Sequence, residues 1–174
     1  SDMEEIFKLK KKYKFNLIED SCHALGGKYK KIRVGSCKFS DISTFSFHPV
    51  KPITTAEGGM ITTNDKNIYE KLILYRTHGI HKNSEKFSNH SLAFDENGEP
   101  NRWYYEMSDL GYNYRITDIQ AALGDSQLRR IEKITKKRNK VAEFYKKEFK
   151  NINGVKIPYT SKNVYHAYHL FTIL

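Results

Sequence analysis

A single lysine between two prolines, with a strand-like run on each side, is the feature that most constrains the fold of this chain. Residues 42–47 (ISTFSF) and 59–63 (GMITT) are rich in β-branched and aromatic side chains or flanked by glycine, which is typical of short β-strands. Lys51 lies between them, beside Pro52 and near Pro49, among uncharged neighbours. An amine in such a loop is either withdrawn from water and nucleophilic, able to form a Schiff base, or an ordinary exposed cation. This stretch alone leaves both interpretations open.

Helices and strands alternate along the rest of the chain, which predicts an α/β fold. Asp2 is placed to cap an N-terminal helix, and Thr117 with Gln120 forms a capping-box pattern at the start of a long basic helix. Gly124 is the position where we expect that helix could break. The predicted elements, in chain order, are helix 2–13, strand 15–18, hairpin 28–34, strands 42–47 and 59–63, helix 66–76 and helix 117–149.

Residues 77–107 show no steady hydrophobic period. The aromatic cluster Trp103, Tyr104 and Tyr105 argues against disorder in this segment. The cluster suits packing against a subunit or stacking on a ligand ring, and we favour packing. The chain opens directly into a helix and ends in a strand-like run, residues 167–174, so we expect a fragment of a longer protein.

The net charge of +10 suggests nucleic-acid binding at first sight, but the placement of the basic residues argues against it. They border two predicted helices and alternate with apolar positions, as on solvated helix faces. No run of about 18 apolar residues predicts a membrane span, and the N-terminus lacks a signal-peptide pattern. Cys22 and Cys37 have neither metal-ligand spacing nor the number for a disulfide framework. We therefore expect a cytoplasmic protein without a metal site, nucleic acid or membrane as partner.

Three polar residues are candidates for a site. Asp20 follows a predicted strand, where open α/β sheets bind ligands, although aspartate also favours caps and turns. His23 lies three residues later, and a lone histidine is more often structural than catalytic. The hydroxyl of Ser46, five residues before Lys51, could bind a phosphate or a backbone group.

Four blocks of sequence, taken together, resemble the DegT/DnrJ/EryC1/StrS family of pyridoxal-phosphate sugar aminotransferases. Each block is weak alone, but the four in the family's order are specific. The blocks are LIEDSCHA at 17–24, FSFHPVKPITT at 45–55, EGGM at 57–60, and GYNYR at 111–115 with TDIQAA at 117–122. The run WYYEM at 103–107 is most similar to the branch that aminates UDP-linked 4-keto-6-deoxy sugars, as in pseudaminic acid synthesis.

The resemblance implies a role for each candidate. Lys51 matches the lysine that holds the pyridoxal phosphate cofactor and moves the substrate proton. Asp20 matches the acid beside the pyridine nitrogen, which keeps that nitrogen protonated. His23 matches a Gln or His near the ring, and Ser46 matches a hydroxyl that binds the cofactor phosphate. Asn113 matches a residue that reaches the cofactor phosphate of a neighbouring subunit, which implies a homodimer with shared sites.

A sixth residue and one departure complete the comparison with the family pattern. Arg115 is a candidate clamp for the carboxylate of the amino donor, by its chemistry. Ala56 stands where the family usually has glycine. Its methyl group is harmless unless the backbone φ angle there is positive, in which case it crowds the loop.

The implied fold is part of the fold type I large domain, with a mostly parallel sheet, followed by the start of a small C-terminal α+β domain. The expected boundaries are 1–125 for the cofactor-binding domain, 126–150 for a linking helix and 151–174 for the small domain. We expect the family's first phosphate-binding turn and its ring-stacking aromatic residue to lie outside this chain.

The implied function is transfer of an amino group from glutamate to a nucleotide-linked 4-keto-6-deoxy sugar for surface glycans. One alternative is the family's sugar dehydratase branch, which has histidine in place of the lysine, so Lys51 argues against it. The other alternative is a non-catalytic fragment that keeps the fold and binds no cofactor. The fragment alone is expected to be inactive.

Overall fold

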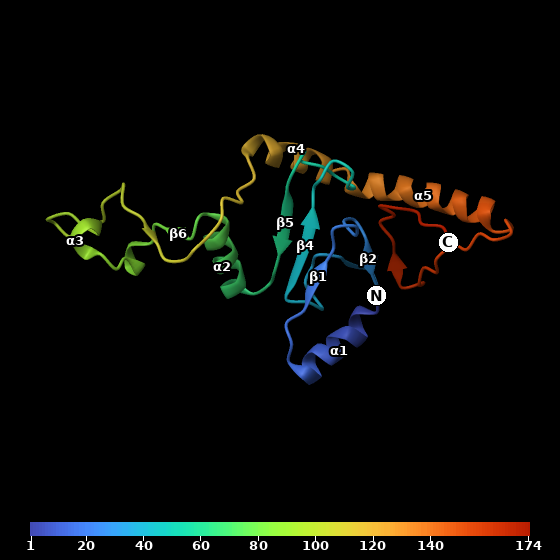
Figure 1. Ribbon diagram of the computed structural model, residues 1–174, viewed down its shortest axis with the longest axis horizontal. Coiled ribbons are helices and arrows are strands. Elements are labelled where there is room, and N and C mark those ends of the chain that lie inside the picture. The colour runs from blue at the N-terminus through green and yellow to red at the C-terminus, as the bar shows by residue number, and fades with distance from the viewer. The chain divides into compact units, whose positions relative to one another are not determined.

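A three-stranded sheet in the order β1–β4–β5 is the frame of the larger of two units in a computed structural model that describes residues 1–174 (Figure 1). This first unit comprises Ser1–Asn64 and Ile116–Leu174, and the second comprises Asp65–Arg115. The elements of the first unit are α1 (Met3–Tyr13), β1 (Ile18–Asp20), β2 (Lys28–Tyr29), β3 (Ile32–Arg33), β4 (Ile42–Ser46), β5 (Gly59–Thr62), α4 (Asp118–Leu128), α5 (Ile131–Phe149) and β8 (Val164–Tyr165). The domain boundaries expected near residues 125 and 150 stay predictions.

The sheet is partly parallel. β1 runs parallel to β4, with Ile18 opposite Ile42, whereas β5 returns antiparallel to β4. The strand expected at residues 15–18 is therefore displaced, and the observed β1 begins at Ile18 and includes both acids. Pairing with β4 sets this position, because the register of the parallel pair begins with Ile18 opposite Ile42.

The hydrophobic core lies between the sheet and α5. Phe45 in β4 and Phe47 just after it pack with Ile53 and with Ile131 at the start of α5. The core therefore connects the strand before Lys51, the loop after it and a helix from the far end of the chain.

The capped helices of this unit form as the sequence predicts. The Asp2 side chain accepts a hydrogen bond from the Glu5 N–H at the start of α1, and Thr117 and Gln120 form the capping box of α4. The predicted break at Gly124 is wrong, because α4 runs through it to Leu128 and α5 begins at Ile131.

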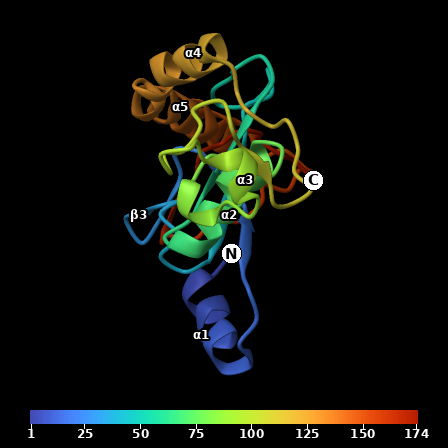
Figure 2. The same ribbon diagram turned by 90° about the vertical axis from the view of Figure 1, so that its left-hand side faces the viewer.

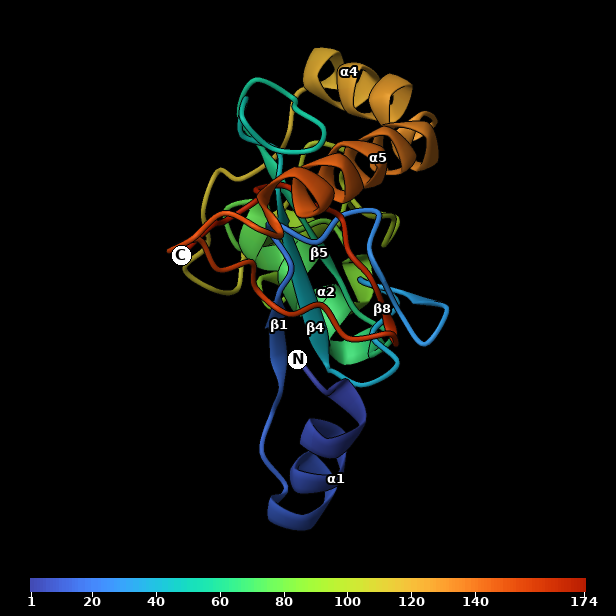
Figure 3. The same cartoon turned by 90° about the vertical axis from the view of Figure 1, so that its right-hand side faces the viewer.

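A second small sheet joins the hairpin to the C-terminal part of the chain. β2 pairs with β3 through a turn in which Lys30 and Lys31 both have positive φ, and β2 also pairs with β8. The predicted hairpin at residues 28–34 is thus confirmed, and Figure 2 shows it projecting at β3. The strand expected at residues 167–174 is not formed, and this segment runs without regular structure beneath α5 (Figure 3). None of the helices is both long and apolar enough to cross a membrane.

The second unit contains the segment without a steady hydrophobic period. Its elements are α2 (Lys66–Arg76), β6 (Ile80–His81), the 3₁₀ turn η1 (Ser84–Lys86), α3 (His90–Ala93) and β7 (Glu106–Met107). The side chains of the aromatic cluster have different environments. Tyr104 packs edge-on against Phe87 at 4.9 Å between ring centroids, whereas Trp103 is 65% exposed. Packing within the chain thus accounts for Tyr104.

Glu106 organises the loop before it. Its two carboxylate oxygens accept hydrogen bonds of 2.8–3.0 Å from the Ser88 N–H and hydroxyl, the Asn89 N–H and the Tyr104 hydroxyl. Backbone hydrogen bonds from Asn89 and Ser88 are the main cause that lowers the pKa of Glu106 from 4.5 to about 2.

We expect this loop to loosen in acid. Because the folded pKa lies below the unfolded value, the contribution of Glu106 is complete above pH 4.5 and is lost as the pH falls toward about 2. The single tryptophan, Trp103, has its ring 5.6 Å from that of Tyr104 and reports the change by fluorescence. Glu106→Gln should abolish this acid transition, and Glu96→Gln, on an exposed side chain, should leave it in place. An unchanged transition in Glu106→Gln would show that another group causes it.

Candidate functional site

Two neighbouring parallel strands bring Asp20 and Ser46 to the same end of the sheet. Asp20 ends β1 opposite Thr44, and Ser46 ends β4 two residues beyond Thr44. Because side chains alternate along a strand, and Ser43 and Phe45 are buried on one face, Asp20, Thr44 and Ser46 share the other face. Figure 1 shows both strands directed toward the end of the sheet where α4 and α5 lie.

Asp20 is held as a carboxylate by its neighbours. Its Oδ1 accepts a 3.1 Å hydrogen bond from the Cys22 N–H. Hydrogen bonds from the Cys22 thiol and backbone hold the pKa of the Asp20 carboxyl below its usual range, and the positive charges of His23 and Lys51 lower it further. Asp20 is therefore negatively charged at neutral pH.

Lys51 ends a tight turn directly after β4. Its N–H donates to the His48 carbonyl at 2.9 Å, and its side chain is half-buried. Two residues further on, Ile53 is only 2% exposed and belongs to the core. Lys51 is thus next to a fixed point of the backbone, and its charge acts on both Asp20 and Cys22.

Helix α4 holds the loop that follows the lysine. The side chain of Gln127 accepts from the Thr54 N–H at 3.3 Å and donates to the Thr54 carbonyl at 2.6 Å. Gln120 donates to the Glu57 carbonyl at 3.0 Å. Neither glutamine was among the predicted site residues. Their spacing of seven residues, which places both on one helix face, is a signal that could have identified them.

Ser46 and His23 both have side-chain polar atoms that are available to bind a ligand. The Ser46 Oγ accepts only a long hydrogen bond, 3.4 Å, from the His48 N–H, which leaves its hydroxyl hydrogen free to donate. His23 is exposed, and its ring packs against that of His169 at 4.4 Å between centroids. Cys22 and His169 are thus further neighbours of the site that the sequence did not reveal.

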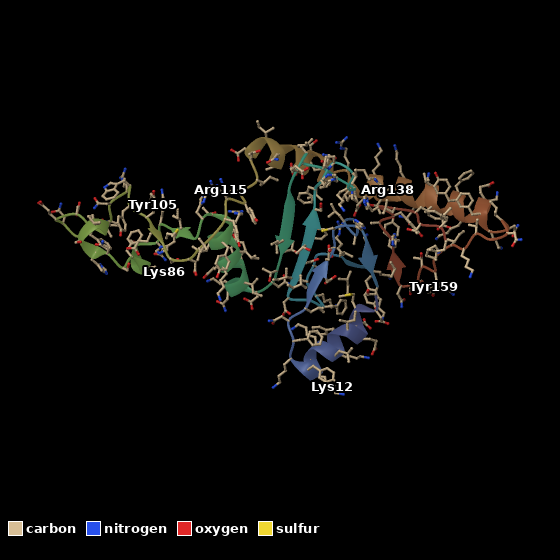
Figure 4. The ribbon with its side chains drawn as sticks, in the orientation of Figure 1. Lys12, Lys86, Tyr105, Arg115, Arg138 and Tyr159 are labelled. Carbon is tan, nitrogen blue, oxygen red and sulfur yellow. The ribbon has the colours of Figure 1, made fainter.

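Asn113 and Arg115 belong to the second unit. Asn113 forms an isolated antiparallel bridge with Thr77, and both it and Arg115 are exposed. Figure 4 labels Arg115 at the end of this unit. The structure therefore places Asp20, His23, Ser46 and Lys51 in one unit and Asn113 and Arg115 in the other, and the roles of all six residues stay predictions.

Ala56, which stands where the family usually has glycine, has a positive backbone φ angle. Its φ angle is +65°, in the left-handed region that favours glycine, while its N–H donates to the Thr54 hydroxyl at 2.9 Å. The methyl group therefore strains the loop just after Lys51.

We expect Ala56→Gly to stabilise the protein by up to about 1 kcal/mol, since the left-handed conformation costs a non-glycine residue ~1–2 kcal/mol and the greater freedom of unfolded glycine offsets ~0.4–1 kcal/mol of the gain. The free energy of unfolding in urea measures the change. Ala121→Gly, on the exposed face of α4, is the matched control and should destabilise by ~0.5–1 kcal/mol. Loss of stability in Ala56→Gly would mean that the loop gains nothing from relief at this residue.

The fold and the site together define an α/β protein in which a lysine in the loop after one strand acts by its charge on a carboxylate at the end of the neighbouring strand. The whole chain, residues 1–174, matches the model of the DegT/DnrJ/EryC1/StrS aminotransferase family. The chain belongs to this family, and its fold is that of the fold type I aminotransferases. The predicted fold class is therefore confirmed.

Individual relatives agree with this assignment. The chain is 41% identical over 170 residues to the UDP-4-amino-4,6-dideoxy-N-acetyl-beta-L-altrosamine transaminase of Campylobacter jejuni, covering 96% of this chain and 40% of that protein. Its structure is similar to Helicobacter pylori PseC, an aminotransferase of pseudaminic acid biosynthesis, with a TM-score of 0.84, 35% identity, and coverage of 100% of this chain and 42% of PseC. The sugar aminotransferase Spr1654 of Streptococcus pneumoniae, in its PLP-form, matches with a TM-score of 0.79 and 26% identity over 99% of this chain and 44% of that one. The chain thus spans about two fifths of the length of its relatives.

Proposed function

We propose that the protein is a pyridoxal-phosphate-dependent transaminase that transfers an amino group from glutamate to a nucleotide-linked 4-keto-6-deoxy sugar. The observation that carries the proposal is the cluster of Lys51, Asp20 and His23 at the carboxyl ends of two parallel strands. Its chemistry fits a phosphate-bearing aromatic aldehyde: an amine, an ionised carboxylate, an imidazole and, on Ser46, a hydroxyl. The similarity to the UDP-sugar transaminase of Campylobacter jejuni supports a UDP-linked sugar as the acceptor, and the similarity to PseC supports pseudaminic acid synthesis.

Each side chain has a separate task in this proposal. When bound, the cofactor supplies an electron sink for the carbon that loses its proton. Lys51 Nζ takes the proton from the α-carbon of the amino donor and later returns a proton, as a general base and then a general acid. Asp20 holds a proton on the ring nitrogen through its negative charge. Ser46 donates its hydroxyl hydrogen to the phosphate, and His23 orients the ring.

Two further residues extend the proposed site. Asn113 binds the phosphate at the site of a partner subunit, so the working form is a homodimer, and Arg115 binds the donor carboxylate. The reaction belongs to cytoplasmic synthesis of surface glycans.

The test is turnover by the full-length protein with pyridoxal phosphate, glutamate and a panel of UDP- and dTDP-linked 4-keto-6-deoxy sugars. We expect release of 2-oxoglutarate with the UDP-linked substrates and visible absorbance from the bound cofactor. Binding of the cofactor without turnover of any UDP-linked sugar would contradict the choice of acceptor. A full-length protein that stays colourless with added cofactor would exclude the transaminase and favour a non-catalytic role.

A further inference from the structure

The backbone around His169 is fixed by helix α5. Arg138, labelled in Figure 4, donates from one guanidinium nitrogen to the carbonyls of Tyr168 at 2.9 Å and His169 at 3.1 Å. Asn139 donates to the carbonyl of His166 at 2.9 Å. Ala167, which is 3% exposed, anchors the same segment. Side chains of α5 thus hold three backbone carbonyls of this segment, which has no regular structure. These hydrogen bonds determine where the His169 side chain lies.

Tyr168 shows that this placement has an energetic cost. Its φ angle is +45°, a conformation that tyrosine rarely adopts, and its N–H is satisfied by the His166 Nδ1 at 2.9 Å. Backbone strain of this kind persists only where the surrounding contacts determine it. The contacts that impose it here are those from Arg138 and Asn139.

The imidazole of His169 has no hydrogen bond of its own. Its Nδ1 is buried and lacks a partner, and its ring lies 4.4 Å from the ring of His23, tilted by 49°. A buried polar atom without a partner is unfavourable, so packing alone would favour an apolar residue at this position. Burial is the main cause that lowers the pKa of His169, and the charges of His23, Lys51 and Arg138 lower it further, so the His169 ring is neutral at neutral pH.

We propose that His169 is a further positioning residue of the site, which fixes the ring plane of His23 through direct ring contact. This inference rests on the proposed function, because His23 has a task only if a cofactor ring lies against it. His169 acts through His23 and need not touch the substrate. The C-terminal segment thereby becomes part of the cofactor site, although it is far from the lysine loop in sequence.

The test combines variants of both histidines in the full-length protein. We expect His169→Ala to weaken cofactor binding, followed by its absorbance, roughly 10- to 100-fold, as misplacement of a site group by about an ångström does. His169→Phe keeps a ring against His23 and should restore most of the affinity. His90→Ala, on an exposed ring of the second unit, is the matched control and should change nothing.

A double-mutant cycle separates positioning from a general loss of structure. On a His23→Ala background, His169→Ala should have no further effect on cofactor affinity. Additive losses, or failure of His169→Phe to restore affinity while the protein remains folded, would overturn the proposal. If His169→Ala fails to fold, the cofactor affinity of the His169→Phe variant decides: retained affinity supports the positioning role, and lost affinity in a folded variant overturns it.

The contact between the rings of His23 and His169 can be measured without cofactor, so this test does not depend on the proposed function. In the cofactor-free protein, nuclear Overhauser contacts between the ring protons of His23 and His169 report the pairing directly. Absence of these contacts would refute the positioning role. A wild-type protein that shows the contacts but binds no cofactor would refute the transaminase proposal, and the positioning of a cofactor-site residue with it, while leaving the ring pairing established.

Discussion

Replacing Lys51 with alanine is expected to lower the rate of transamination by the full-length protein by roughly 10²–10⁴-fold, the usual contribution of a positioned general acid–base. No other amine lies on the loop between β4 and β5, so no neighbouring amine can replace Lys51 in moving the proton at the donor α-carbon. The Lys51 side chain is half-buried and forms no ion pair within 4.0 Å, so its removal should leave the free energy of unfolding nearly unchanged. Single-turnover kinetics with glutamate measure the loss.

Two companion variants distinguish a nucleophile from an ordinary cation. Lys51→Arg keeps the positive charge beside Asp20 but provides a group that does not deprotonate, so it should be as inactive as the alanine variant. Lys133→Ala, on the exposed face of α5, should retain full activity. Substantial turnover by Lys51→Arg would show that only the charge is needed, and the exposed-cation interpretation of the lysine would then be correct.

The parts of the structure that the sequence predicts well are those set by short-range interactions. The helix caps at Asp2 and Thr117 each depend on a side chain that reaches a backbone N–H three residues away. The strands on either side of Lys51 follow from a few β-branched and aromatic residues joined by a loop with two prolines. In these places local chemistry and the final fold favour the same conformation.

Gly124 shows where local reasoning fails. Glycine in a helix suggests a break, but here a Cβ atom would lie 2.9 Å from the Thr55 methyl carbon. The residue therefore permits close approach of α4 to the loop after Lys51. The actual break, at Arg129 and Arg130, carries no glycine or proline, and the chain there turns Ile131 into the core. Long-range packing, which no local pattern encodes, decides both outcomes.

The candidate site was predictable to a similar degree. Asp20, Ser46 and Lys51 are recognised because each lies at the end of a strand or in the loop after it, where the family motifs are also found. The contribution of Gln127 and His169 depends on contacts across 73 residues to Thr54 and on ring packing across the chain to His23. The seven-residue spacing of Gln120 and Gln127 marks one helix face, but no local pattern indicates which distant residue a side chain will contact.

Replacing Ile53 with alanine is expected to destabilise the protein by ~2–5 kcal/mol, the usual cost of a large-to-small change in a core. Ile53 is 2% exposed and packs with Phe45, Phe47 and Ile131, so little relaxation can fill the space. The loop carrying Lys51 loses its anchor, and we expect activity to fall even where the protein is still folded. Urea unfolding and single-turnover kinetics measure the two effects.

The size of the effect distinguishes an anchored loop from one that merely rests on the surface. Ile53→Val removes one methylene and should cost only ~0.5–1.5 kcal/mol, whereas Ile152→Ala, at a residue 49% exposed, should stay within about 0.5 kcal/mol of wild type. If Ile53→Ala costs no more than Ile152→Ala, the lysine loop is not held by the core. The position of Lys51 would then depend on the hydrogen bonds of the loop three to four residues beyond the lysine. These are the two between Gln127 and Thr54, and those that the Thr54 hydroxyl and the Thr55 N–H donate to the Phe47 carbonyl, each at 3.0 Å.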